Sequence, residues 1–319
     1  MRSRCFAVIG ALVVVTVVSL MPVLVGAQAP KGTAGATTWT QKTPWGDPDL
    51  QGEWTGSTTT PMQRPIGGQV VVTDPEELSR LFDQPPTGTG PAESGRQSGP
   101  GTYNAFWREY GKPVPGQTSL IVDPPDGRLP PMTPEGKQRA TISRFPEGGS
   151  ANPEDRGPNE RCINWEVVIG GGVSTWYRIV QTPGYVALSQ YRMHDMRIIP
   201  LDRRPHLPQD VHQWQGDSRG HWEGNTLVVD TTNFTNKTPV QGSSEKLHLI
   251  ERFTRVDADT IRYEATLDDP TTWARPWTFA NPLRKDTDGF YEYACHEGNH
   301  AMTGILSGTR AEEREKAGK

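Results

Sequence analysis

The chain has 319 residues, and its 33 lysine and arginine side chains against 37 aspartate and glutamate side chains give a formal net charge of −4. A mildly acidic chain lacks the concentrated positive charge that binds nucleic acid or anionic lipid, so we expect neither as a partner. Hydrophobic residues make up only 34%, and the 34 glycines and 29 prolines predict many turns and few long helices.

The first 27 residues have the pattern of an export signal. Arg2 and Arg4 precede an apolar run from Phe6 to Val25, and small residues lead to a cleavage point after Ala27. The run is also near the length that spans a bilayer, which leaves an uncleaved anchor as the alternative. We therefore predict a signal peptide over 1–27 and a periplasmic or secreted protein that is free of the membrane after cleavage. Removal of the two arginines changes the formal charge to −6.

Residues 28–117 are rich in threonine, proline and glycine. A short helix is predicted at 74–82, where Asp74 can cap the first turn and Pro75 stands within it. Another is predicted at 102–111. The stretch 85–101 has too little apolar surface to order itself alone. We expect an irregular N-terminal extension with short helices that packs on the domain that follows it.

From residue 118 onward, apolar and polar residues alternate with period two between turn sequences. The clearest segment is LHLIERFTRVDADTIRYEATLDDP (247–270), in which two alternating runs flank an Asp-Ala-Asp turn. Similar runs meet at Thr-Pro-Gly (182–184) and at Gly224-Asn225, and one helix is predicted at 133–144. The pattern predicts a mostly β domain over 118–319, either an antiparallel β-barrel or a β-sandwich with a few short helices.

Two cysteines remain after the signal, because Cys5 lies within it. In an oxidising compartment, two leftover cysteines more often pair with each other than bind a metal. We predict a disulfide between Cys162 and Cys295. Closing a loop of this length stabilises an unstrained fold by about 4 kcal/mol.

The histidines are confined to the last part of the chain, where two segments combine them with carboxylates and arginines. MHDMRIIPLD contains His194, Asp195 and Arg197, and GDSRGHWEGN contains Asp217, Arg219, His221 and Glu223. In an extended strand, the four odd-numbered side chains of the second segment project to the same face. That row contains the acid, the base and the charged group that general acid–base catalysis uses, and a solvated ladder of ion pairs is the alternative.

Tryptophans flank this second segment. Trp214 and Trp222 lie on either side of the row that begins at Asp217. An aromatic wall beside charged groups is typical of a site for a sugar, a phenolic ring or a cation.

The segment CHEGNH (295–300) contains the His-Glu-x-x-His letters of a zinc protease. Such a site needs a helix, because only the spacing of one helical turn places both imidazoles on one side of the metal. Gly298 and Asn299 are poor helix formers, so we predict a strand followed by a turn, with no protease. A divalent metal held by a subset of His194, His221, His296 and His300 stays open.

Several motifs resemble a family of secreted bacterial proteins with no established reaction. They include WGDPDLQGEWT (45–55), SRGHWEGNTLVVDTTNF (218–234) and YEYACHEGN (291–299). The resemblance implies export and brings no activity with it. In addition, Gly52 and Trp54 in LQGEW are similar to the Gly-x-Trp start of lipocalin-like barrels.

These observations lead to two main hypotheses. The first is an extracytoplasmic enzyme of general acid–base type, a hydrolase or lyase, acting on a small polar or aromatic compound. The second is a lipocalin-like protein that binds a small molecule without catalysis, and a structural protein of the cell envelope is a third. The predicted catalytic residues are His194, Asp195, Asp217, His221, Glu223, His296 and Glu297, and the predicted substrate-binding residues are Arg197, Arg219, Trp214 and Trp222.

Overall fold

The computed structural model describes residues 39–67, 74, 76, 109–141, 150–165, 167–172, 175–237, 240–289 and 292–318. All of them belong to one compact unit that runs from Thr37 to Lys319. The predicted signal at 1–27 lies outside the described residues. The two helices predicted at 74–82 and 102–111 lie almost wholly outside them as well.

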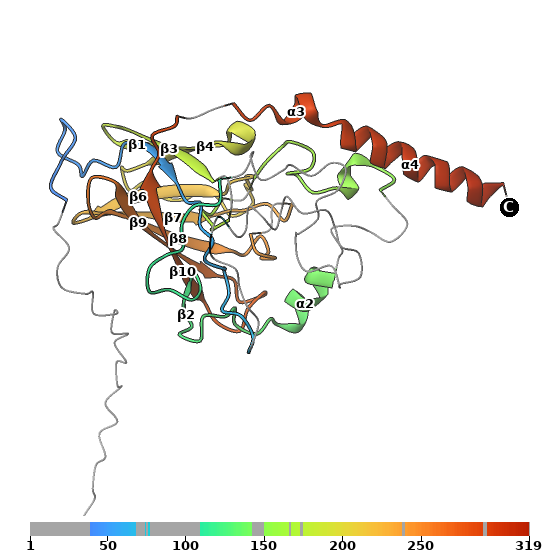
Figure 1. Cartoon of the computed structure of the whole chain (residues 1–319), viewed down its shortest axis with the longest axis horizontal. Coiled ribbons are helices and arrows are strands. Elements are labelled where there is room, and N and C mark those ends of the chain that lie inside the picture. The colour runs from blue at the N-terminus through green and yellow to red at the C-terminus, as the bar shows by residue number, and fades with distance from the viewer. Residues whose placement is uncertain are drawn as a thin grey trace, which may run out of the picture. The chain divides into compact units, whose positions relative to one another are not determined.

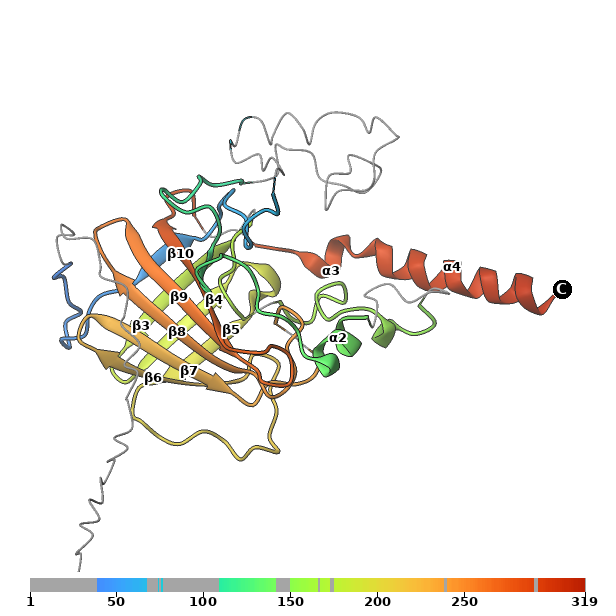
Figure 2. The same ribbon diagram turned by 90° about the horizontal axis from the view of Figure 1, so that it is seen from below.

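Ten strands form one antiparallel sheet in the order β5-β4-β3-β1-β10-β9-β8-β7-β6, and β2 pairs with β10 outside this path. The path curves into a nearly closed barrel, which confirms the predicted fold class (Figure 2). The first five strands are β1 Gly52–Thr55, β2 Ile121–Asp123, β3 Trp176–Thr182, β4 Tyr185–Gln190 and β5 Met196–Pro200. The others are β6 Asp217–Glu223, β7 Thr226–Thr232, β8 His248–Arg255, β9 Thr260–Asp268 and β10 Trp277–Lys285.

The hairpins form where the turn sequences predict them. Gly184 and Gly224 have positive φ angles in the turns that join β3 to β4 and β6 to β7. Such angles favour glycine, because it has no Cβ. In β8 and β9, every second side chain is buried. This alternation confirms the two alternating runs that were predicted on either side of the turn over 247–270.

The barrel closes where β5 and β6, the two ends of the strand order, lie side by side. A Cβ atom on Gly220 would lie only 2.6 Å from Leu201 Cδ2 and 2.8 Å from Ile199 Cγ2. Glycine at position 220 therefore lets β6 approach β5 closely. The side chains of Ile199 and Leu201 pack against it.

The inside of the barrel is packed with large side chains. Trp54 is fully buried, and its indole Nε1–H donates to the carbonyl of Leu50 at 3.1 Å. Burial of rings of this size is a large source of stability. Fully buried residues include Trp54, Trp273, Trp277, Tyr263, Phe253 and Phe279.

One strand comes from the range for which irregular structure is predicted. β1 pairs with β3 on one side and with β10 on the other, so it lies within the barrel wall. With only four residues, GEWT, it is too short to display an alternating pattern. The sequence beyond residue 118 therefore does not contain the whole sheet.

The sequence predicts one of the described α-helices, α2, and does not predict α3 and α4 (Figure 1). Helix α2, Pro134–Thr141, lies in the range predicted as helical and begins after Thr133, whose hydroxyl accepts from the Gly136 N–H at 2.9 Å. The 3-10 helices η2 and η3 span Pro153–Asp155 and Arg192–His194. None of the described helices is long and apolar enough to cross a bilayer.

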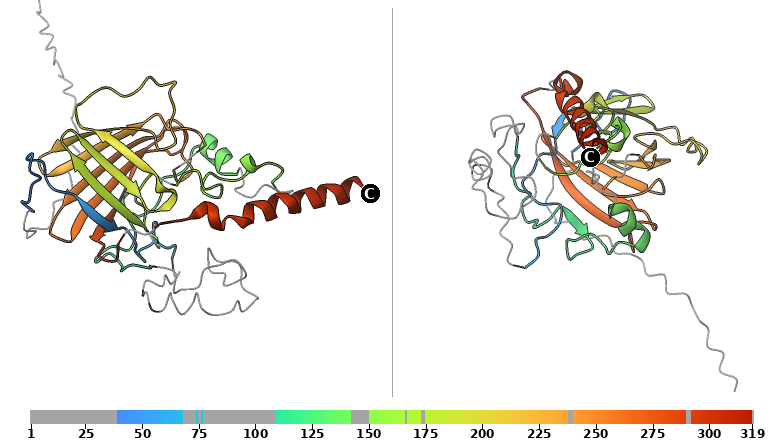
Figure 3. Two further views of the ribbon diagram at one scale, coloured as in Figure 1. Left: turned by 90° about the horizontal axis from the view of Figure 1, so that it is seen from above. Right: turned by 90° about the vertical axis from the view of Figure 1, so that its right-hand side faces the viewer.

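The prediction of a strand and turn at the C-terminus is wrong. Residues 292–294 are irregular, α3 spans Cys295–Gly298, and α4 spans His300–Ala317 (Figure 3). The glycines near the start of α4 lower helix propensity, but the following sequence TRAEEREKA consists mostly of strong helix formers. A prediction from the first residues of the segment misses that contribution.

The predicted disulfide is confirmed. Cys162 and Cys295 are bonded, with 5.8 Å between their Cα atoms, across 133 positions of sequence. The Asn299 side-chain amide adds a hydrogen bond to the carbonyl of Glu160 at 2.8 Å. Together these contacts attach the start of the C-terminal helices to the loop before β3.

Candidate functional site

The row of charged residues on β6 has the geometry that the alternation predicts. Ser218 faces inward, where its hydroxyl lies 2.9 Å from that of the fully buried Thr231. Asp217, Arg219, His221 and Glu223 therefore project from the outer face of the wall. The row divides into two clusters, one under the loop 201–216 and one in solvent.

Asp217 is the buried member of the first cluster, although it lies on the outer face, because the loop 201–216 covers it. Its carboxylate accepts from Arg219 Nη1 at 2.6 Å and from the backbone N–H of Leu207 at 2.9 Å. Nδ1 of His206 lies 2.9 Å from the same carboxylate. Asp217 thus fixes both the side chain of His206 and the backbone that follows it.

Asp230 on β7 is the second carboxylate of the cluster and lies opposite Arg219 in the β6–β7 register. Its Oδ1 lies 3.2 Å from Nε2 of His206 and 2.9 Å from Nε2 of His248. One carboxylate oxygen is therefore shared by two imidazole rings, one from the loop and one from the start of β8. We call Asp217, Arg219, His206, Asp230 and His248 the His–Asp cluster.

The pKa values in this cluster shift in opposite directions. The hydrogen bond to Asp230 raises the pKa of His248, and burial opposes that rise only in part. Burial alone would raise the pKa of Asp230, but the hydrogen bond and charges of the two histidines outweigh it and lower the pKa. Both shifts favour the ion pair of a protonated ring with a carboxylate.

An open cavity of about 400 Å³ adjoins the cluster. Its volume falls within the range of pockets that hold small organic ligands. Most of the lining residues have polar side chains, among them three histidines, one lysine and one glutamate. The lining residues are His206, Leu207, Gln209, His212, Thr232, Asn233, Glu245, Lys246, Leu247 and His248.

Asn233 holds the loop in place over this outer face. Its side-chain amide donates to the carbonyls of Leu207, Pro208 and Val211, at 3.3, 2.7 and 3.0 Å. The residue has a φ of 58°, a conformation that asparagine tolerates better than most residues. Nδ1 of His212, 2.8 Å from the carbonyl of Phe234, adds a further contact.

The second cluster of the β6 row is an exposed ladder of ion pairs. Nε2 of His221 lies 3.2 Å from the Glu223 carboxylate, and Arg252 on β8 donates to the same carboxylate at 2.6 Å. The hydrogen bond from Arg252 is the main cause of the lowered pKa of Glu223. Exposed pairs of this kind contribute little to stability.

The segment around residue 194 does not form a histidine–aspartate pair. His194 is exposed in η3, and no hydrogen bond joins it to Asp195 among the described residues. Asp195 instead accepts from the backbone N–H of Trp165 at 2.8 Å and from the side chains of Asn164 and Gln215. Burial raises the pKa of Asp195 in spite of these bonds.

Arg197 lies inside the barrel. Its guanidinium donates two hydrogen bonds to the carboxylate of Glu251, and the Tyr263 hydroxyl donates to the same carboxylate at 2.9 Å. Glu251 is fully buried. Arg197 therefore neutralises a core carboxylate, whereas the sequence predicts that it binds substrate.

The two predicted aromatic residues differ in environment. Trp222 packs against the hydrophobic core, and Trp214 is 40% exposed. Neither tryptophan is among the described residues that line the cavity.

His296, Glu297 and His300 are exposed on α3 and α4. Asn299, with φ −82° and ψ 50°, interrupts the helix between the two histidines. The described residues include no group of three histidine, cysteine, aspartate or glutamate side chains that is arranged to hold a metal ion.

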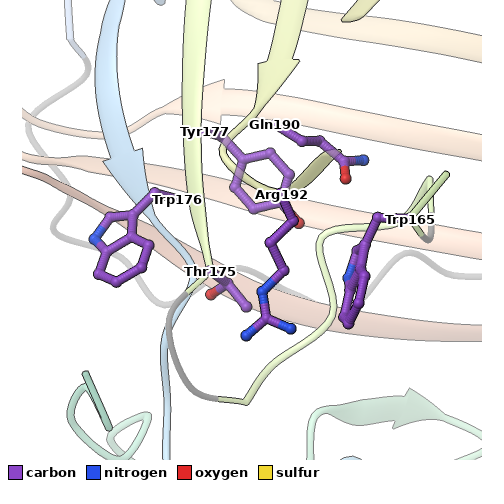
Figure 4. A pocket seen from close by; sticks show the side chains of 6 residues that line it. All are labelled: Trp165, Thr175, Trp176, Tyr177, Gln190 and Arg192. Atoms are coloured by element: carbon purple, nitrogen blue, oxygen red, sulfur yellow. The ribbon is translucent and has the colours of Figure 1, made fainter. Parts of the chain in front are cut away.

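A second, much smaller pocket lies where β3 begins and β4 ends (Figure 4). The guanidinium of Arg192 lies 4.4 Å from the centre of the Trp165 ring. Its volume is about 10 Å³, which is room for roughly one water molecule. The pocket is lined by Trp165, Thr175, Trp176, Tyr177, Gln190 and Arg192.

The residues that the sequence analysis missed are His206, Asp230 and His248. Each stands in a different segment. Strand register brings Asp230 and His248 together, since Arg219 opposes Asp230 and Thr231 opposes Leu249, the neighbour of His248. His206 reaches them from the loop 201–216 through its contacts with the two aspartates. Polar residues at outward positions of adjacent strands were the available signal. Using it requires the strand order.

Comparison with family models and with curated proteins gives no match. Among solved structures, the chain is similar to a mutant of the fluorescent protein UnaG at 15% identity. The match covers 41% of this chain and 88% of that one, with a TM-score of 0.23.

Proposed function

We propose that the chain binds a small polar molecule and that the ligand occupies the cavity beside the His–Asp cluster. The observation that carries the proposal is the cavity of about 400 Å³ lined by hydrogen-bonding side chains. A lipocalin-like carrier would hold its ligand inside the barrel, but large side chains and the Arg197–Glu251 pair occupy that space here. The outer cavity is therefore the better candidate.

The disulfide supports an oxidising compartment for this function. Together with the export signal predicted at 1–27, it leads us to propose a periplasmic or secreted binding protein. The division at residue 117 is not needed for the function, because strand β1 belongs to the same barrel as the site.

The proposal is tested by screening small polar compounds for an increase in melting temperature and repeating the screen on two tryptophan variants. Leu207→Trp fills the cavity from its lining, and Ile198→Trp is the matched control at an exposed position of β5. We expect compounds that stabilise the wild-type protein to bind Leu207→Trp at least about tenfold more weakly and Ile198→Trp normally. Equal binding to both variants would place the ligand elsewhere.

Acid–base catalysis at the same cavity is the second candidate. It is favoured by one observation, the hydrogen bond between Nε2 of His248 and Asp230, because a carboxylate fixes the tautomer and orientation of a catalytic imidazole. The roles predicted for Asp217 and Arg219 become structural support for this pair. The roles predicted for His194, Asp195, His221, Glu223, His296 and Glu297 remain predictions without a place in this site.

Turnover of the bound compounds distinguishes catalysis from binding alone. If His248 is the base or acid, His248→Gln lowers the rate of conversion by about 100-fold or more. His221→Gln in the same assay tests the role predicted from the β6 row. Binding without conversion by the wild-type protein would leave a binding protein only.

A further inference from the structure

We infer that the ligand of this cavity is an anion, a carboxylate or phosphate group that is held by the imidazole of His248 and by the ammonium group of Lys246, next to His206. The inference rests on the proposed function, because it names the chemical class of ligand for the same cavity.

The first step concerns His206. Both of its ring nitrogens lie within hydrogen-bonding distance of carboxylates, Nδ1 at 2.9 Å from Asp217 and Nε2 at 3.2 Å from Asp230. A neutral imidazole has one N–H, so one of these contacts would bring a nitrogen lone pair against a carboxylate oxygen. Only the doubly protonated ring donates to both. Both ring nitrogens of His206 are therefore directed at carboxylates.

The second step concerns the carboxylates beneath the rings. Asp217 is occupied by Arg219, His206 and the backbone N–H of Leu207, and Asp230 by the two histidines. Neither residue lines the cavity. The two carboxylates take both ring nitrogens of His206 and Nε2 of His248. Among the described residues, Nδ1 of His248 has no hydrogen-bond partner, so it can donate to a ligand.

The third step concerns the remaining charges of the lining. Lys246 is exposed, and the described residues give its ammonium group no ion pair. Glu245 is the one acidic residue among the lining residues, against His206, His212, His248 and Lys246. A lining with this surplus of basic side chains matches an anion better than a neutral or cationic compound.

Binding should therefore depend on pH through His248. Its ring faces Asp230 on β7 and lies opposite Asp268 on β9, and His206, Glu245 and Lys246 are the other charged or titratable groups beside it. Raising the pH through the raised pKa of His248 removes cationic charge from the cavity, which weakens the attraction for an anion.

The test uses four probes that share one aromatic ring: benzoate, phenyl phosphate, neutral benzyl alcohol and cationic benzylamine. Binding to the full-length protein is measured by the change in the ring resonances of His206 and His248 on titration. We expect benzoate or phenyl phosphate to bind at about pH 6 and at least about tenfold more weakly at about pH 8. The comparison of these two anions tells whether carboxylate or phosphate is preferred.

Three variants accompany the titrations. Lys246→Gln and His248→Gln should each weaken the anion by about tenfold, and Lys285→Gln, an exposed lysine on β10, should not. Melting temperatures close to the wild-type value show that the variants are folded. The inference is supported if Lys246→Gln and His248→Gln weaken the binding of the anions and if benzyl alcohol and benzylamine do not bind.

Two outcomes overturn it. If benzyl alcohol or benzylamine changes the resonances of the cavity as strongly as the anions do, the cavity binds small molecules without selecting anions. The proposed function then stands and the inference fails. If no compound in the screen, of any charge, affects the cavity, the proposed function fails together with the inference.

Discussion

At the scale of single residues, the shared carboxylate of Asp230 decides how the outer site behaves. Two imidazoles from different segments meet on one oxygen atom, and Asp217 holds the first of them from the other side. The arrangement couples the protonation of the rings to the position of the loop 201–216. Stability should therefore vary with pH in a defined direction.

The pKa of His248 is raised by its hydrogen bond with Asp230, so its contribution is complete below the pKa of histidine in the unfolded chain. The contribution is lost as the pH rises through the higher folded-state pKa. We predict that His248→Gln lowers the free energy of unfolding by less than about 1 kcal/mol near pH 5.5, since the pair is half-exposed. The difference should vanish by about pH 8.5. A difference that grows with pH would contradict the ion pair.

The buried pair in the barrel gives a second prediction. Replacing Glu251 by leucine leaves the Arg197 guanidinium charged and unpaired in the core, which should lower the free energy of unfolding by about 3–5 kcal/mol. The double variant Arg197→Met, Glu251→Leu should recover most of this loss, because it removes both charges. Chemical denaturation of the three proteins measures the effect. If the double variant is as unstable as Glu251→Leu, the unpaired charge of Arg197 is not the cause of the loss.

The sequence could indicate individual residues of the site but could not assemble them. Alternation along β6 correctly places Asp217 and Arg219 on one face. The partners His206, Asp230 and His248 were beyond prediction, because each interacts across strands or loops. Arg197 and Glu251 stand at core-facing positions of their strands, where apolar residues are expected. A charged residue at each of these positions was the signal of a buried pair.

At the scale of elements, the loop 201–216 is held by a few specific polar contacts. Asn233 donates to three of its carbonyls. Asp has nearly the same size and tolerates the same backbone conformation, but its carboxylate cannot donate. We predict that Asn233→Asp accelerates amide hydrogen exchange in residues 207–213 and lowers the free energy of unfolding by about 1–3 kcal/mol.

The control for this experiment is Asn225→Asp, the same change at an exposed turn position between β6 and β7. It should leave exchange in the loop unchanged. If both variants leave the loop protected, the carbonyl contacts of Asn233 do not hold it.

The elements differ in how far the sequence predicts them. The hairpins β3–β4, β6–β7 and β8–β9 were predictable, because their alternation and turn residues are local properties. β1 was not, because its four residues gain their place only from pairing with β3 and β10. Helices α3 and α4 were not either, because the prediction gave most weight to Gly298 and Asn299.

At the scale of the whole molecule, one disulfide closes a loop that contains β3 to β10. Because such a crosslink restricts the unfolded chain, we predict that the double variant Cys162→Ser, Cys295→Ser loses about 4–5 kcal/mol of unfolding free energy. Denaturation with and without a reductant measures the loss in the native protein. If the variant instead keeps the unfolding free energy of the barrel and only the amides of α3 and α4 exchange faster, the disulfide anchors the helices and does not stabilise the barrel.

Because side chains fill the inside of the barrel, we place the proposed binding site on the outer face of its wall. The interior holds fully buried rings and the Arg197–Glu251 pair, whereas the open cavity lies at the end of β7 and the start of β8, where Thr232 and His248 line it. The most direct test is an experimental structure of the protein with benzoate or phenyl phosphate bound. The account predicts the anion against His206, His248 and Lys246. An anion located inside the barrel, or on a face distant from Asp230, would contradict it.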